Sequence, residues 1–207
     1  VARPPEVSWH DVIAQLIVAN GLESEAAAVK VIAVAGSPGA ARFDGTLLVT
    51  ARGYEPPSIT SGFALVTYPE CRHTPLAADK TTNYMFYKLA GDWAKHQGAD
   101  GALILNADGT VSETNAANLF CAVGGTLYCP VSPHVLPGVM AAAVRQLLAR
   151  WGKRIEDRAI SLDELKGADA VFVTNSLLGA APVTHIDQRP ISSSSALCER
   201  INRAVFA

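Results

Sequence analysis

The Lys80 amine is the first group in this sequence whose neighbours suggest chemistry. It stands in "KTTNY", three residues before Asn83 and just ahead of a helix pattern. A lysine amine can attack a carbonyl or move a proton when it is partly neutral. Glu113, in "TVSETNAANLF", offers a carboxylate at the end of a predicted strand. Brought together, an amine and a carboxylate of this kind would suit covalent catalysis with proton transfer.

Two further stretches follow in the same order along the chain. "LPGVM" places Gly138 at the start of a helix pattern, and "VTNSLLGAAPV" places Asn175 and Ser176 just past a predicted strand. Each feature also has an ordinary structural explanation. A lysine beside a helix start is usually a solvated charge, Pro-Gly is common before a helix, and Thr-Asn-Ser is a common turn. Only the combination favours a functional site.

The elements that position these residues follow from hydrophobic periodicity and from glycine and proline stops. Helices are expected at 8–21, 84–98, 136–152, 161–169 and 192–206. Strands are expected at 28–36, 46–53, 62–69 and 170–176, a strand, a turn and a second strand at 101–113, and a hairpin at 118–130 with its tip at Gly124-Gly125. This mixture predicts an α+β or α/β fold that is rich in hairpins. "YEPPSIT" is the best linker candidate, so we expect a small domain at 1–53, a linker at 54–60 and a large domain at 61–207.

Composition excludes several classes of function. The 207 residues are 49% hydrophobic and carry a net charge of −2 without a basic run, which argues against nucleic acid and anionic membranes as partners. No apolar stretch is long enough to span a membrane. The four cysteines lack zinc or C-x-x-C spacing, so we expect no metal and reduced thiols in the cytoplasm. Neither a phosphate-loop lysine motif nor a G-x-S-x-G elbow is present.

Taken in order, "KTTN", "GADGALILNADGTVSETNAANLF", "LPGVM" and "GADAVFVTNSLLGAAPV" resemble the class IV family of pyridoxal-phosphate enzymes. This family, also called fold-type IV, includes branched-chain aminotransferases, D-amino-acid aminotransferases and aminodeoxychorismate lyases. The resemblance runs from about residue 28 to the C-terminal helix. It implies an α/β small domain and a larger mixed domain with a pseudo-barrel sheet, like D-amino-acid aminotransferase. It also implies that the N-terminal part of the small domain, with a phosphate-binding arginine, is missing.

The resemblance implies that pyridoxal 5'-phosphate is the cofactor and that Lys80 is covalently linked to its aldehyde. After substrate binds, the freed Lys80 amine would move the proton at the substrate carbon. Glu113 would accept a hydrogen bond from the pyridine nitrogen and keep that nitrogen protonated. Tyr84 would reach the phenolic oxygen of the cofactor, although the branched-chain enzymes place this tyrosine one residue further from the lysine.

The resemblance assigns the cofactor phosphate to two segments. The backbone N–H groups of Val139 and Met140, at a helix N-terminus, would bind the phosphate dianion. Ser176, with Asn175, would add side-chain donors to the same phosphate.

Several details are most similar to aminodeoxychorismate lyase. Asn83 lies three residues after Lys80, and Met140 stands where aminotransferases usually have a threonine. Lys30 stands where branched-chain enzymes tend to have a substrate-binding arginine, so it is a candidate substrate-binding residue. The reaction implied is conversion of 4-amino-4-deoxychorismate, a small-molecule substrate, to 4-aminobenzoate and pyruvate, in folate biosynthesis.

Two alternatives stay open. The first is an aminotransferase that acts on branched-chain or D-amino acids with 2-oxoglutarate. The second is a non-catalytic truncated relative, or a dimerisation module. The family also implies a homodimer.

Overall fold

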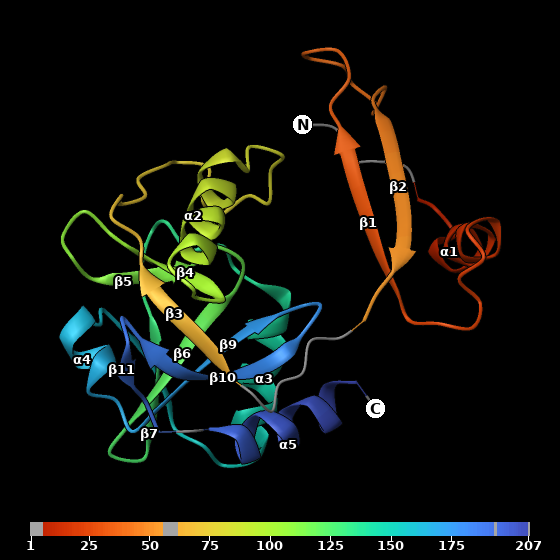
Figure 1. Ribbon diagram of the computed structural model, residues 1–207. Helices are drawn as coiled ribbons and strands as arrows, with labels where there is room; N and C mark the ends of the chain where they lie inside the picture. Colours follow the sequence, from red (N-terminus) through yellow and green to blue (C-terminus); the bar gives the residue numbers. More distant parts are fainter. Residues whose placement is uncertain (1–5, 56–61, 193, 207) are drawn as a thin grey trace. The chain divides into compact units, whose positions relative to one another are not determined.

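The computed structural model describes residues 6–55, 62–192 and 194–206 (Figure 1). The chain divides into two compact units, Val1–Pro56 and Pro57–Ala207. The predicted linker at 54–60 lies outside the described residues from residue 56 onward, as does residue 61, the expected first residue of the large domain. The proposed domain boundaries therefore stay a prediction.

The first unit consists of one helix and a two-stranded sheet. Helix α1 (Trp9–Ala19) begins after Ser8, whose hydroxyl donates to the Asp11 carboxylate at 2.6 Å, and it ends before Gly21, whose φ of 65° suits a glycine. Strands β1 (Ala27–Val34) and β2 (Thr46–Gly53) pair antiparallel over their full length, and α1 lies beside β2. This unit presents Lys30 on β1, opposite Thr50.

The second unit is built on a nine-stranded sheet with the order β5-β4-β3-β10-β9-β6-β7-β8, and β11 pairs with β10. The strands are β3 (Phe63–Thr67), β4 (Gly101–Leu105), β5 (Val111–Thr114), β6 (Asn118–Val123), β7 (Thr126–Pro130), β8 (Ile155–Arg158), β9 (Ala170–Asn175), β10 (Gly179–Ile186) and β11 (Arg189–Pro190). Strand β3 pairs parallel with β4 and β10, and β7 pairs parallel with β8; the other pairs are antiparallel.

The sheet curls on itself, because β5 at one end of the order also contacts β6 and β7 near the other end. Inside the curl lies a core of aliphatic side chains that includes Leu103, Val111, Ile160 and Ile186. The mixed α+β architecture with a curled, partly closed sheet confirms the predicted fold class. The curl brings the end of β5, which carries Glu113, close to the segment at 131–138 that follows β7.

Four helices accompany the sheet (Figure 1): α2 (Met85–His96), α3 (Val139–Arg150), α4 (Leu162–Lys166) and α5 (Ser195–Val205). Helix α2 packs on β4 through Ala90 and Ala94, both fully buried. Helices α3 and α5 cover the outer face of the sheet, where Phe120 and Phe172 stack with ring centroids 4.8 Å apart. Successive side chains of a strand point to opposite faces of the sheet. Strands β6 and β9 therefore each contribute side chains to the core inside the curl and to the core under α3 and α5.

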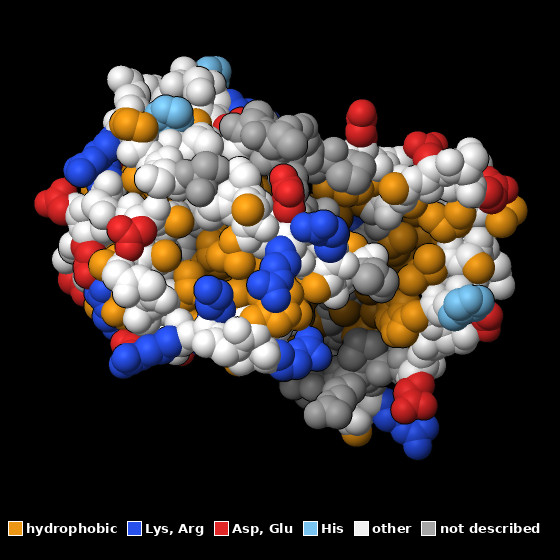
Figure 2. Space-filling view, turned by 90° about the horizontal axis from the view of Figure 1, so that it is seen from below, with side chains coloured by type: hydrophobic (Ala, Val, Ile, Leu, Met, Phe, Trp, Pro, Cys, Tyr) orange, Lys and Arg blue, Asp and Glu red, His pale blue; other side chains and the backbone are white. Residues whose placement is uncertain are grey.

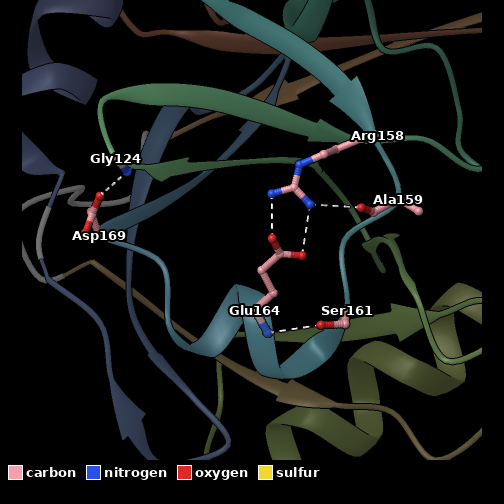
Figure 3. Close-up of polar contacts among 6 residues, drawn as sticks. All are labelled: Gly124, Arg158, Ala159, Ser161, Glu164 and Asp169. Carbon is pink, nitrogen blue, oxygen red and sulfur yellow. Dashed lines mark hydrogen bonds and ion pairs between the residues drawn. The ribbon is translucent and has the colours of Figure 1, made fainter.

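A polar cluster fixes the start of α4 (Figure 3). The Ser161 hydroxyl accepts a hydrogen bond from the Glu164 N–H, the bond that an N-cap serine makes. The Glu164 carboxylate forms a bidentate ion pair with the Arg158 guanidinium at the end of β8. The Asp169 carboxylate accepts a hydrogen bond from the Gly124 N–H at 2.7 Å. This bond ties the β6–β7 turn to the segment before β9.

The face shown in Figure 2 carries both charged and apolar side chains. Lysine and arginine side chains are interspersed with acidic ones and with exposed hydrophobic groups on the face shown. Among the described residues, none of the helices combines the length and the apolar character that crossing a bilayer requires.

Cys121, Cys129 and Cys198 are buried free thiols, and Cys71 is an exposed one.

Candidate functional site

One pocket of about 500 Å³ gathers most of the residues that the sequence singled out. All of its lining residues, from Arg72 to Leu177, belong to the second unit. They come from the loop before α2, the end of β5, the loop before α3 and the loop after β9. The predicted site residues that line the pocket are Lys80, Tyr84, Glu113, Val139, Met140, Asn175 and Ser176.

Lys80 lies in the loop that leads into α2 and is exposed to solvent along the pocket wall. Its ammonium donates a hydrogen bond to the Tyr84 hydroxyl and lies 5.0 Å from the centre of the Tyr84 ring. The loop is turned by backbone bonds from Thr81 N to Asp79 O and from Tyr84 N to Thr82 O. This geometry holds the amine beside a phenol that can accept or donate a proton.

Glu113 is the buried acid of the pocket, with 4% of its surface exposed. The Tyr87 hydroxyl donates to Oε1 at 2.5 Å, and the Leu136 N–H donates to Oε2 at 3.2 Å. Burial raises the pKa of Glu113, while these two donors and the nearby charges of Arg72 and Lys80 act in the opposite direction. Lys80 and Glu113, 33 positions apart in the sequence, are thus close enough to influence each other electrostatically.

Tyr87, which binds Glu113, is itself in contact with Arg72. The Arg72 guanidinium carbon lies 4.3 Å from the centre of the Tyr87 ring and 5.2 Å from that of Phe86, both within the range of a cation–π contact. Arg72 Nε is buried and has no hydrogen-bond partner among the described residues. The aromatic rings of α2 therefore set the position of this guanidinium.

The N-terminus of α3 lines the pocket. Gly138 is the N-cap residue and supplies no side-chain cap, so the first N–H groups of the helix, including those of Val139 and Met140, lack partners within the helix. Thr174, at 1% exposure, lines the same pocket, and its buried hydroxyl has no partner among the described residues. Orphaned donors next to a helix N-terminus suit an anion.

The loop after β9 shapes this side of the pocket. The Asn175 side chain accepts from the N–H groups of Leu177 and Leu178 at 2.9 and 3.0 Å and donates to Ala116 O at 3.2 Å. These bonds make Asn175 a turn-forming residue, and its predicted part in phosphate binding stays a prediction. Ser176 lines the pocket and is exposed, so its hydroxyl is accessible.

Lys30 is the predicted site residue that does not line this pocket. It lies on β1 of the first unit and is exposed. Its proposed role in substrate binding stays a prediction.

Arg72, Tyr87 and the Leu136 N–H were not predicted from the sequence, whereas Thr174 stands beside the predicted Asn175 and Ser176. Tyr87 had one weak signal, because it lies three residues after Tyr84 and therefore on the same face of α2. The Leu136 N–H had none, since a backbone donor has no residue type. Asn118 explains how that donor is held, because its Nδ2 donates to Leu136 O at 2.8 Å.

Comparison with known proteins gives concordant matches. The sequence model of the class IV amino-transferases matches residues 3–186. Branched-chain-amino-acid aminotransferase-like protein 2 of Arabidopsis thaliana is 34% identical over 160 residues, which are 75% of this chain but 28% of that protein. The chain therefore spans under a third of the length of that relative.

Solved structures extend the likeness over nearly the whole chain. A Legionella pneumophila protein provisionally described as a 4-amino-4-deoxychorismate lyase superposes with a TM-score of 0.85 at 26% identity, covering 98% of this chain and 78% of that one. The branched-chain amino acid aminotransferase of T.th., solved with pyridoxamine 5'-phosphate, gives a TM-score of 0.81 at 26% identity, covering 95% and 68%.

Proposed function

Because the chain belongs to the class IV aminotransferase family, whose members are pyridoxal-phosphate enzymes, we propose that its pocket binds pyridoxal phosphate and acts on an amino compound. When bound, this cofactor supplies an electron sink next to the carbon that carries the substrate's amino group. The observation that carries the proposal is that one pocket joins Lys80, the buried Glu113 carboxylate and the N-terminus of α3.

The residues present fit this cofactor. An amine suits its aldehyde, a buried carboxylate suits its pyridine nitrogen, and unpaired N–H groups at a helix N-terminus suit its phosphate. The orphaned Thr174 hydroxyl lies on the wall that also carries Met140 and Ser176. A volume of about 500 Å³ lies within the usual range for a site that encloses a small ligand. Lys80 is therefore proposed to hold the cofactor covalently.

We favour cleavage of 4-amino-4-deoxychorismate as the reaction. The support is the lyase-like protein whose structure covers 98% of this chain, together with Met140 at the α3 N-terminus. Lys80 would remove the proton at the ring carbon that bears the amino group. The enolpyruvyl group then leaves as pyruvate, and the ring becomes the aromatic ring of 4-aminobenzoate. The reaction is balanced without a second substrate.

Transamination is the second candidate, and a specific observation favours it: the sequence relative at 34% identity is named for branched-chain aminotransferases. In this case the amino group passes to 2-oxoglutarate, and Lys80 moves the protons between donor, cofactor and acceptor. The two reactions differ in whether an acceptor is needed.

Product analysis separates these candidates. The full chain with pyridoxal phosphate is given 4-amino-4-deoxychorismate alone, and 4-aminobenzoate and pyruvate are measured. In parallel it is given branched-chain L-amino acids or D-alanine with 2-oxoglutarate, and glutamate is measured. The lyase proposal predicts equal amounts of aromatic product and pyruvate without acceptor, lost in Lys80→Ala and kept in Lys88→Ala, a lysine on α2 that pairs with Asp92. Glutamate alone would favour transamination, and no product in either assay would favour the non-catalytic alternative.

We also propose a state of assembly and a location. Met85 and Leu89 of α2 are exposed apolar side chains, 66% and 53% accessible, which supports a face covered in a homodimer. Light scattering on the purified chain tests the dimer. A cytoplasmic location is proposed because the described cysteines are free thiols.

A further inference from the structure

Tyr87 links helix α2 to the buried acid of the pocket. It lies on the first turn of α2, seven residues after Lys80, and its hydroxyl donates to Glu113 Oε1 at 2.5 Å. The contact spans 26 positions in the sequence and joins α2 to the end of β5. Tyr87 lines the pocket, so it adjoins the volume where a ligand of Glu113 would lie.

A carboxylate with 4% exposure needs such donors to stay ionised. Among the residues that the structure describes, two donors bind Glu113 directly, the Tyr87 hydroxyl and the Leu136 N–H. It also provides two cations that act through space, Arg72 from the loop before α2 and Lys80. The Tyr87 contact is the shorter of the two direct hydrogen bonds, so it is the stronger candidate for setting the state of the acid.

We propose that Tyr87 is a positioning residue that fixes the orientation and the ionised state of Glu113, and thereby keeps the shared proton on the cofactor's pyridine nitrogen. This inference rests on the proposed function, since it assigns Glu113 to that nitrogen. One proton lies between two bases, the Glu113 carboxylate and the pyridine nitrogen. If the buried carboxylate became the stronger base it would take the proton, and the ring would lose its power to withdraw electrons.

The surroundings of Tyr87 suit a permanent donor. Burial raises the pKa of the Tyr87 phenol well above its ordinary value, and the hydrogen bond and negative charge of Glu113 raise it further. The Arg72 cation partly opposes this rise, and Tyr84 adds to it. The phenol therefore keeps its proton across the working pH range. The Arg72 guanidinium, 4.3 Å from the ring centre, packs the ring in place.

The direct test is a titration of Glu113 in the chain without cofactor. Glutamate labelled with ¹³C at the carboxyl carbon is followed by NMR against pH, and the signal missing in Glu113→Gln identifies Glu113. Tyr87→Phe removes only the donor atom, so we expect the Glu113 midpoint to rise by about one to two pH units, the size of one hydrogen bond to a charged group. Tyr68→Phe is the matched control, because its ring packs edge-on against Phe86 and Trp93 of the same helix. A Glu113 midpoint equal in Tyr87→Phe and wild type overturns the proposal.

A second variant tests the contact between Tyr87 and Glu113 by changing Glu113, so it does not require Tyr87→Phe to fold. In Glu113→Gln the neighbouring charge is gone, so one of the five tyrosine phenols should titrate at lower pH than in wild type. If all five phenols titrate as in wild type, Tyr87 does not sense Glu113 and the proposal fails.

The cofactor-loaded chain separates this inference from the proposed function. Borohydride reduction of wild type, followed by peptide mass analysis, shows whether pyridoxal phosphate is attached to Lys80. Given attachment, the absorption spectrum of the bound cofactor should change with pH at a different midpoint in Tyr87→Phe and at the wild-type midpoint in Tyr68→Phe. Absence of attachment in wild type overturns the proposed function, while the cofactor-free titration still decides whether Tyr87 sets the ionisation of Glu113.

Discussion

The loop before α3 is predicted to depend on one glycine for lack of space. Gly138 has φ −69° and ψ 132°, a backbone conformation open to alanine, so its need for glycine is not conformational. A Cβ atom added there would overlap the Asn118 side-chain oxygen and come within 3.1 Å of its Cγ atom. Asn118 would have to move, and its 2.8 Å bond to Leu136 O would break. The residue that would lose this bond, Leu136, is also the one whose N–H donates to Glu113.

The magnitude follows from that broken contact. Gly138→Ala should lower the free energy of unfolding by about 1–3 kcal/mol, the cost of a part-buried polar group left without its partner. Asn118→Ala removes the same hydrogen bond and should cost a similar amount. In the Asn118→Ala background the added methyl finds room, and Gly138→Ala should then change stability by less than about 1 kcal/mol, because the entropy lost by the unfolded chain and the poorer N-cap oppose each other.

Urea unfolding of wild type, Gly138→Ala, Asn118→Ala and the double variant, followed by far-ultraviolet circular dichroism, measures the energetic coupling between the two substitutions. Gly167→Ala is the matched control, because a Cβ there meets its nearest atoms at 3.4 and 3.6 Å, an ordinary contact. Its effect should be the same with and without Asn118. If Gly138→Ala costs equally in both backgrounds, overlap with Asn118 is not the reason for the glycine, and the predicted coupling is refuted.

Two further predictions concern the scaffold. Asp187 has a lowered pKa, because its bonds to Lys166 at 2.7 Å and to Thr67 outweigh the rise that burial causes. A depressed folded pKa means that this contribution is present above the unfolded value of about 3.9 and is lost as pH falls through the folded value. Asp187→Asn should therefore lower the free energy of unfolding by about 1 kcal/mol at pH 7 and by less at pH 3, and a difference independent of pH would contradict this. Phe172→Ala should cost about 3–5 kcal/mol in urea unfolding, because the ring is 1% exposed and stacks on Phe120; a cost under about 1 kcal/mol would show that this core closes around the cavity.

Elements with strong local signals could be predicted from the sequence. The apolar run of β9 and the glycine stop after α2 depend on nearby residues, and the structure places both where the sequence indicated. Strand β8 was missed because "IEDR" has no strand signal of its own. It forms because its backbone pairs with β7 and because Arg158 binds Glu164. Local patterns cannot report such partners.

The site shows the same division. That Lys80 and Glu113 share a pocket was expected from a family resemblance, since no spacing rule brings positions 80 and 113 together. The supporting contacts of Tyr87 and Leu136 arise from the curl of the sheet, which moves the end of β5 toward α2 and the loop before α3. They depend on tertiary geometry, and only the structure reveals them.

The central claim is that Lys80 is the attachment point of pyridoxal phosphate. The most direct measurement is the mass of the full chain after incubation with the cofactor and borohydride, with the modified peptide mapped. The account predicts a gain of one pyridoxyl phosphate group per chain, located on Lys80 and absent in Lys80→Ala. An adduct on another lysine, or an unchanged mass, would contradict it.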